Sequence, residues 1–257
     1  MAHVVVAIAV FAFAQEPAAA QDLRKAGSAE LSTFIASELT IGAEHADRAV
    51  QATTNQLHVR AEYAVPEARE WGIFINIPFL AVDSGSGARR GGLGDVSFGV
   101  EHAFGEWKGL TIGGSFEFGL QTASDPLVGG TATTIRPAVA AAKELSETLL
   151  ATAELAWRRS LHEDVGRDDI NQVEFSLMAA WKVPCEFMPR WYTVGRLRTA
   201  YDWEPARGVA TLELSLVKIA GDASNLRLAP FYEVALTERT VDVLFAWRVG
   251  LDLTFYF

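Results

Sequence analysis

The sequence predicts an all-β protein, namely a closed antiparallel up-and-down transmembrane β-barrel of about 12 strands. A long period of two near the end of the chain, its repetition in segments of about 10 residues, and charges on one face support this prediction. From Val241 to the terminal Phe257, every odd position is apolar and most even positions are small, polar or charged. Because successive side chains of a strand point to opposite faces, this strand has one apolar wall and one polar wall.

The polar wall indicates where water lies. Asp242, Arg248 and Asp252 could not lie unpaired in a protein core. We therefore expect the apolar wall to face lipid and the polar wall to enclose solvent. A terminal aromatic residue on the apolar wall is typical of bacterial outer-membrane barrels, which predicts export to the outer membrane.

The C-terminal strand also predicts two kinds of partner. Its apolar wall should contact outer-membrane lipids. Its last apolar positions should carry the assembly signal that the barrel-assembly machinery reads, namely Phe257, Phe255 and Leu253.

Similar alternation recurs along the chain between turn-forming residues. The expected strands are 32–41, 57–65, 71–82, 95–104, 110–121, 133–142, 149–158, 173–182, 191–201, 210–218, 226–236 and 241–257. An even number of strands places both chain ends on the periplasmic side. The connections expected there are mostly short: 66–70, 105–108, 143–147, 183–190 and 220–225. Those expected outside are mostly longer: 42–55, 83–92, 122–132 and 160–170, with 204–208 and 237–240 short.

Aromatic residues fall at the expected strand ends, as in barrels whose two rims carry aromatic side chains at the headgroup level. Near the periplasmic rim we expect Trp71, Phe104, Trp107, Trp181, Trp191 and Phe257, and near the outer rim Trp157, Tyr201 and Trp203. His102 is interpreted as an interfacial residue rather than a ligand. Pro78, Pro137 and Pro230 fall within expected strands, where bulges or shortened pairing should accommodate them.

The N-terminus resembles a secretory signal. Its longest apolar run, Val4 to Ala14, is too short to span a membrane as a helix. Small residues at 18–20 suit cleavage before Gln21, so we expect a signal peptide at 1–20 and the barrel at 21–257. A buried N-terminal strand is the alternative. Gln21 to Leu31 is expected to be too short for a plug domain.

Composition excludes several classes of protein. A net charge of -10 argues against nucleic acid as a partner, because phosphate binding relies on clustered Lys and Arg. The single cysteine, Cys185, is incidental to the fold. The histidines are scattered and no nucleophile or metal-ligand motif is present, so we expect no enzyme, no metal and no cofactor.

The polar faces supply charges of both signs to one enclosed space. The expected lumen-lining residues are Arg60, Glu62, Asp95, Glu117, Arg136, Glu154, Arg158, Glu174, Arg196, Arg198, Glu213, Arg227, Glu233 and Arg248. Twelve strands should leave a narrow or plugged passage. Its charges either select polar or weakly anionic small solutes, or only pair with one another to satisfy a wet interior.

The stretch from Gly91 to Phe104 resembles a recurring element of a family of outer-membrane transporters named for the meta-pathway of phenol degradation. Gly92, Gly94 and Asp95 match its Gly-x-Gly-Asp opening, and the turn at 143–147 is similar to another of its turns. The resemblance implies uptake of small compounds, aromatic or hydrophobic ones among them. From the residues alone, Asp95 should point into the lumen and cap loop amides.

Two alternatives to a transporter remain. The barrel could be a non-conducting structural or adhesive protein of the outer membrane. Less favoured is a soluble lipocalin-like binding barrel, whose apolar face would turn inward and whose charges would face bulk water.

Overall fold

The computed structural model describes residues 18–27, 36–48, 52–68, 70–83, 89–125, 128, 132–163, 169–203, 206–221, 225–237 and 245–257. The apolar N-terminal run and Val241 to Leu244 lie outside these residues. None of the helices in the described part of the chain is long and apolar enough to cross a membrane.

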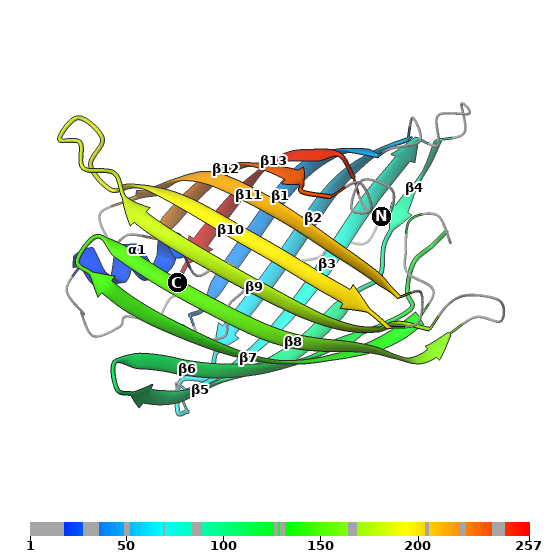
Figure 1. Ribbon diagram of the computed structural model, residues 1–257, viewed down its shortest axis with the longest axis horizontal. Coiled ribbons are helices and arrows are strands. Elements are labelled where there is room, and N and C mark those ends of the chain that lie inside the picture. Colours follow the sequence, from blue (N-terminus) through cyan, green and yellow to red (C-terminus); the bar gives the residue numbers. More distant parts are fainter. Residues whose placement is uncertain are drawn as a thin grey trace.

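The strands form one closed antiparallel sheet (Figure 1). Its strands are β1 (Glu38–Arg48), β2 (Ala52–Ala64), β3 (Trp71–Asp83), β4 (Arg89–Leu93), β5 (Ser97–Trp107), β6 (Leu110–Gly119), β7 (Ala132–Ser146), β8 (Leu149–Glu163), β9 (Asn171–Lys182), β10 (Trp191–Asp202), β11 (Arg207–Ala220), β12 (Leu226–Ala235) and β13 (Trp247–Tyr256). Each strand pairs with its neighbours in sequence, except that β5 pairs with β3 instead of β4, and β1 pairs with β13 to close the ring.

The barrel has twelve strand positions, as predicted, because β4 and β5 share one of them. Both pair with β3, β4 along Phe79 to Asp83 and β5 along Trp71 to Asn76. Pro78 lies opposite the break between them, where its missing N–H breaks no ladder bond, and its carbonyl accepts from the Gly94 amide at 2.8 Å. Pro137 and Pro230 likewise lie where one neighbouring ladder is interrupted, which confirms the expected irregularities.

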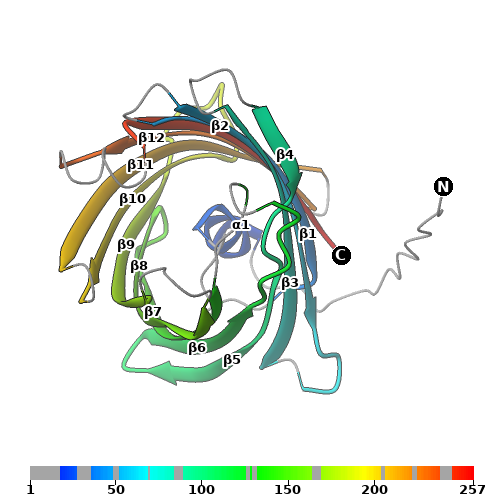
Figure 2. The same cartoon turned by 90° about the vertical axis from the view of Figure 1, so that its right-hand side faces the viewer.

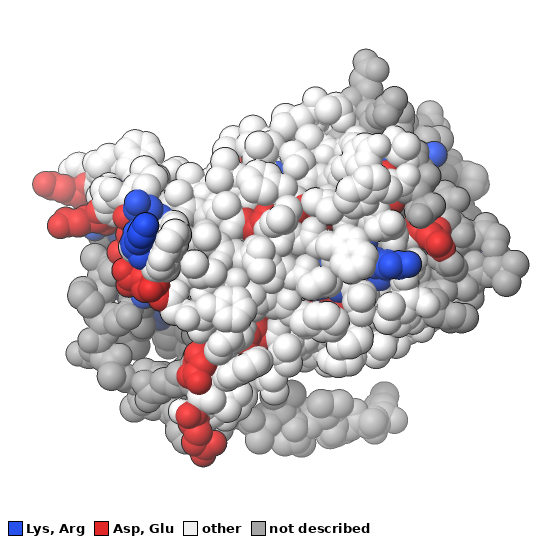
Figure 3. All heavy atoms as spheres, turned by 60° about the horizontal axis from the view of Figure 1, so that its bottom comes forward, with Lys and Arg blue, Asp and Glu red and all other residues white. Residues whose placement is uncertain are grey.

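The outer wall of the barrel is apolar. On β9, Phe175, Leu177 and Trp181 are exposed while Met178 and Ala180 are buried inside. Figure 3 shows one face of the molecule, on which most charged residues gather toward the two ends and the middle is largely uncharged. A surface with so many exposed large apolar side chains is suited to acyl chains rather than to water.

Aromatic side chains mark both ends of the wall, as predicted. At the end with the short turns, the His102 ring stacks on Trp71 at 4.3 Å and meets Phe104 edge-on at 4.9 Å. His102 therefore lies in an aromatic cluster on the outer surface. At the other end, Tyr201 and Trp203 make an edge-on contact at 5.7 Å.

A short helix, α1 (Ala18–Gly27), lies inside the ring of strands (Figure 2). Its residues Leu23 and Ala26 are buried in a cluster with side chains from β7 to β12, including Leu150, Met178 and Tyr192. Arg24 pairs with Glu144 at 2.8 Å, near the turn between β7 and β8. The sequence predicted only that the segment before the first strand is too short for a plug domain, and it did not predict this helix. One helical face is enough to cover this apolar part of the inner wall.

Several strand boundaries differ from the expectation, and those of the first and last strands differ most. The first strand runs from Glu38 rather than 32–41, so the described parts of the expected 42–55 loop are strand. Its outward positions include Ala43 and His45, which hide the apolar period. The last strand begins at Trp247, and Phe245 is buried beneath the Arg248 guanidinium instead of lying on the lipid-facing wall.

Candidate functional site: the barrel lumen

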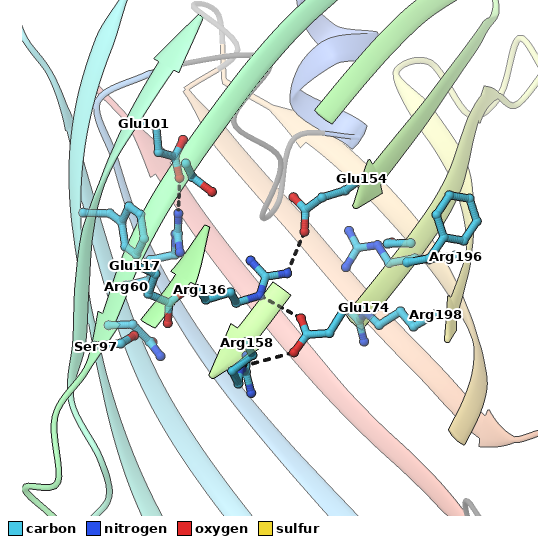
Figure 4. A pocket seen from close by; sticks show the side chains of 15 residues that line it. Arg60, Ser97, Glu101, Glu117, Arg136, Glu154, Arg158, Glu174, Arg196 and Arg198 are labelled. Carbon is cyan, nitrogen blue, oxygen red and sulfur yellow. Dashed lines mark hydrogen bonds and ion pairs between the residues drawn. The ribbon is translucent and has the colours of Figure 1, made fainter. Parts of the chain in front are cut away.

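A cavity of about 320 Å³ lies in the middle of the lumen (Figure 4). Charged and polar side chains from both halves of the ring line it. From β2 to β6 these are Arg60, Asn76, Ser97, Glu101, Ser115 and Glu117, and from β7 to β10 they are Arg136, Glu154, Arg158, Glu174, Ser176, Arg196 and Arg198. The size is at the lower end of small-molecule sites.

Arg136 is the centre of the first charged group. Its Nη2 donates to Glu154 at 2.6 Å and its Nε donates to Glu174 at 2.7 Å. Glu174 also pairs with Arg158 at 3.2 Å. Since three neighbouring strands supply these residues, the ion pairs lie across the strand ladders and fix the side chains against the wall.

A second group surrounds Arg60 on β2. Its Nη2 donates to Glu101 at 2.9 Å and to Glu62 at 3.4 Å, and its guanidinium lies over the Phe74 ring at 4.2 Å. Glu38, on β1 and directly opposite Glu62 in the ladder, is also buried here. This part of the wall is therefore rich in carboxylates.

A third group runs from β10 to β1. Arg198 pairs with Glu213 at 3.1 Å and with Glu233 at 3.2 Å. Arg248 pairs with Glu233 as well and with Glu44 at 3.0 Å. Glu233 is almost fully buried, so its charge is matched by the two arginines rather than by water.

The chain after β6 is fastened to the inner wall at the far end from α1. Oδ1 of Asp95 accepts from the amides of Thr122 and Ala123 at 3.0 and 2.9 Å, as the sequence predicted. The Ser124 amide donates to the Leu93 carbonyl at 3.0 Å. Val128 is buried, and its carbonyl lies close to Gly94.

Gly92 and Gly94 leave room for this segment. A Cβ at Gly92 would collide with the Ser124 hydroxyl, and one at Gly94 would lie 3.1 Å from the Val128 carbonyl and from Pro78. The Gly-x-Gly-Asp motif thus forms a clasp, by which we mean Gly92, Gly94 and Asp95 in contact with 122–124 and Val128 at the inner wall. The lumen is narrowed by this segment at one end and by α1 at the other.

The structure brings most of the expected lumen residues into these groups, with Arg196 joining the third through Glu213 at 3.9 Å, and three lie apart. Asp95 acts in the clasp, and Glu117 lines the cavity outside the groups. Arg227 is 4% exposed, and its Nε and Nη1 atoms have no hydrogen-bond partner among the described residues. The sequence interpretation missed the inward-facing Glu38, Glu44 and Glu101, although Glu101 follows Ser97 and Gly99 on one face of the same strand.

The sequence interpretation also missed the apolar part of the inner wall. The wall around α1 carries Val194, Val217 and Ile219, all buried. Because these strand segments carry apolar residues on both faces, the sequence did not indicate which face points inward. The helix-forming segment before the first strand was the available signal.

No protein-family model and no curated protein matches the chain. Solved structures do. The chain is similar to an outer-membrane channel from Pseudomonas putida F1, with a TM-score of 0.69 and 11% identity over 87% of this chain and 96% of that chain. It is also similar to the NanC porin, with a TM-score of 0.58 and 10% identity over 84% of this chain and 98% of that chain.

A third similar structure is the KdgM porin, with a TM-score of 0.54 and 10% identity over 85% of this chain and 99% of that chain. At such low identities the likeness shows the fold alone. Together with the apolar outer wall, it defines the chain as a β-barrel of the outer-membrane type. The meta-pathway family has no support beyond the motif that suggested it.

Proposed function

We propose that the protein is a narrow channel of the outer membrane that passes small polar solutes. The main support is the cavity itself: a closed barrel with an apolar exterior encloses a solvent-accessible space lined by arginines and glutamates. Charged groups in such a wall replace part of the hydration of a passing solute. The three channel and porin structures of similar fold are consistent with this function.

The charged lining favours polar solutes over aromatic or hydrophobic ones. Phe74 is the principal aromatic residue facing the cavity from β3, and its ring is covered by Arg60. The comparisons give no support for an aromatic solute. We therefore propose a channel for small polar solutes and not for the aromatic or hydrophobic compounds that the motif resemblance implied.

Single-channel recording in planar bilayers tests the proposal. Purified protein should give discrete conductance steps, and Arg198→Glu should change their ion selectivity because this side chain lines the cavity. Arg89→Glu is the matched control, since that side chain is 87% exposed outside the lumen. Absence of steps at all voltages, together with no solute uptake by liposomes, would instead indicate a structural or adhesive barrel.

We also propose that residues 1–20 direct export and that the last strand directs assembly. Phe255 is exposed on the outer wall, and the Phe257 amide closes the barrel by donating to Ser37 at 3.0 Å. Removal of Phe257 should lower the amount of folded barrel in the outer membrane. An unchanged amount would show that assembly does not read this residue, whatever the channel conducts.

A further inference from the structure

The charges that face the cavity are unevenly distributed around the ring. The β7 to β10 wall contributes four arginines and two glutamates, whereas the β2 to β6 wall contributes one arginine and two glutamates. Within this lining, acidic Glu117 on β6 and cationic Arg158 on β8 lie on the two strands that flank β7. Opposite charges placed in this way produce a local field directed along the wall from β8 to β6.

Two side chains on these walls are the most available to a solute. Arg158 has 39% of its side chain exposed and, among the described residues, pairs with Glu174 alone, at 3.2 Å. Glu117, which lines the same cavity from β6, makes no ion pair or side-chain hydrogen bond in the described part of the chain. Arg136 lies directly opposite Glu117 in the ladder, but its ion pairs are with Glu154 and Glu174.

We propose that the cavity binds small zwitterions, with the solute's ammonium group toward Glu117 and its carboxylate toward Arg158. This inference rests on the proposed channel function and assigns its substrate class. A solute with one charge satisfies only one of these two side chains and leaves the other unmatched. A zwitterion that lies along the wall over β7 satisfies both, so it replaces more of the water that it loses on entering.

The cavity volume agrees with a small solute. About 320 Å³ has room for about ten water molecules at about 30 Å³ each. That space suits a compound with a few carbon atoms between its charges. Serines at 97, 115 and 176 offer further hydrogen bonds without adding charge.

Three probes of equal chain length provide the test: γ-aminobutyrate, butyrate and butylammonium. Proteoliposomes containing the full chain should take up γ-aminobutyrate about tenfold faster than either singly charged analogue, because each charge-assisted contact contributes about one order of magnitude. Glu117→Gln should abolish the preference over butyrate, and Arg158→Gln should abolish the preference over butylammonium.

Arg159→Gln is the matched control, because Arg159 follows Arg158 directly but lies on the outer face beside Trp157. Glu117→Asp keeps the carboxylate and should restore part of the preference. Such a recovery would show that the loss in Glu117→Gln comes from the missing charge and not from a failure to fold. Equal uptake of all three probes would overturn the zwitterion site and leave the channel intact. If no probe enters, the channel proposal fails, and calorimetry with γ-aminobutyrate and detergent-solubilised protein then tests the binding site by itself. Binding that Glu117→Gln removes would support the zwitterion site. Absence of binding would refute the zwitterion site.

Discussion

Asp95 and Ala123 are 28 positions apart in the chain, yet the Asp95 carboxylate accepts a hydrogen bond from the Ala123 amide at 2.9 Å. The same oxygen accepts from Thr122, so one side chain fixes the start of the segment that folds into the lumen. A carboxylate that accepts two amide hydrogen bonds holds a loop more firmly than a neutral acceptor would. The motif at the break between β4 and β5 therefore controls how wide the passage is.

Replacing Asp95 should widen the channel. In Asp95→Ala the amides of Thr122 and Ala123 lose their partner at a cost of about 1–3 kcal/mol, so the segment should leave the inner wall. Single-channel conductance should rise, and protease should cut within 120–128. Asp83→Ala is the control, because Asp83 pairs with Arg89 on the outer rim. Unchanged conductance together with protease resistance would show that the segment is held by other contacts.

The clasp also predicts a steric effect at Gly94. In Gly94→Ala the new methyl group would press against Leu80, Pro78 and the Val128 carbonyl, which should lower stability by about 1–3 kcal/mol. Gly195→Ala on β10 is the control, because its methyl group would meet only Leu214, at 3.7 Å. Urea unfolding in detergent measures the stability of both variants. Equal midpoints would mean that the segment moves aside without cost.

Helix α1 should restrict the other end of the lumen. Leu23 is 1% exposed, and burying an aspartate without a partner at this site costs several kcal/mol, more than the roughly 2–3 kcal/mol gained from burying a leucine. Leu23→Asp should therefore release the helix and increase conductance. Arg24→Ala, on the exposed side of the same turn, should leave the helix bound. If Leu23→Asp conducts like the wild type, α1 does not narrow the passage.

The charged group around Arg136 should be sensitive to the loss of one member. Arg136→Met leaves Glu154 and Glu174 without their main partner, which should cost about 3–5 kcal/mol. Adding Glu154→Gln and Glu174→Gln should recover much of this loss, because no buried charge then remains unpaired. The single and the triple variant both carry Arg136→Met, so the difference between their urea midpoints does not depend on the change of volume at that residue. If Arg136→Met alone is as stable as the wild type, water already screens the carboxylates of Glu154 and Glu174.

The fold could be predicted from the sequence because lipid and enclosed water impose opposite demands on alternate residues. Strand β9 shows this plainly, with Phe175 and Leu177 outside and Glu174 and Ser176 inside. The alternation of apolar outward and polar inward residues failed where one face of a strand did not follow this pattern. In the second half of β1 the outward positions include Ala43 and His45 in place of large apolar residues, and around α1 the inner wall becomes apolar because it contacts a helix instead of water.

The individual charge partners could not be predicted, because register and side-chain reach decide them. Arg198 contacts Glu233 although β11 lies between their strands in the ring, and no spacing in the sequence indicates this pair. Asp95 was different. Its position after Gly92 and Gly94, at the start of an expected strand, favoured the capping of loop amides, and the structure shows that role.

Adjacent residues on β9 test which face of the barrel meets lipid. Leu177 is 46% exposed on the outer wall, and Ser176 lines the cavity. An arginine in the lipid core costs about 2–4 kcal/mol near the bilayer midplane, so Leu177→Arg should destabilise the barrel in bilayers by that amount. Ser176→Arg instead enters a wet space that already holds arginines, so it should change stability little while reducing conductance and shifting selectivity. Folding titrations in lipid vesicles and single-channel recording distinguish the two variants. A barrel with its apolar face inward would give the reverse: Leu177→Arg would be tolerated, Ser176→Arg would unfold the protein, and neither would affect transport.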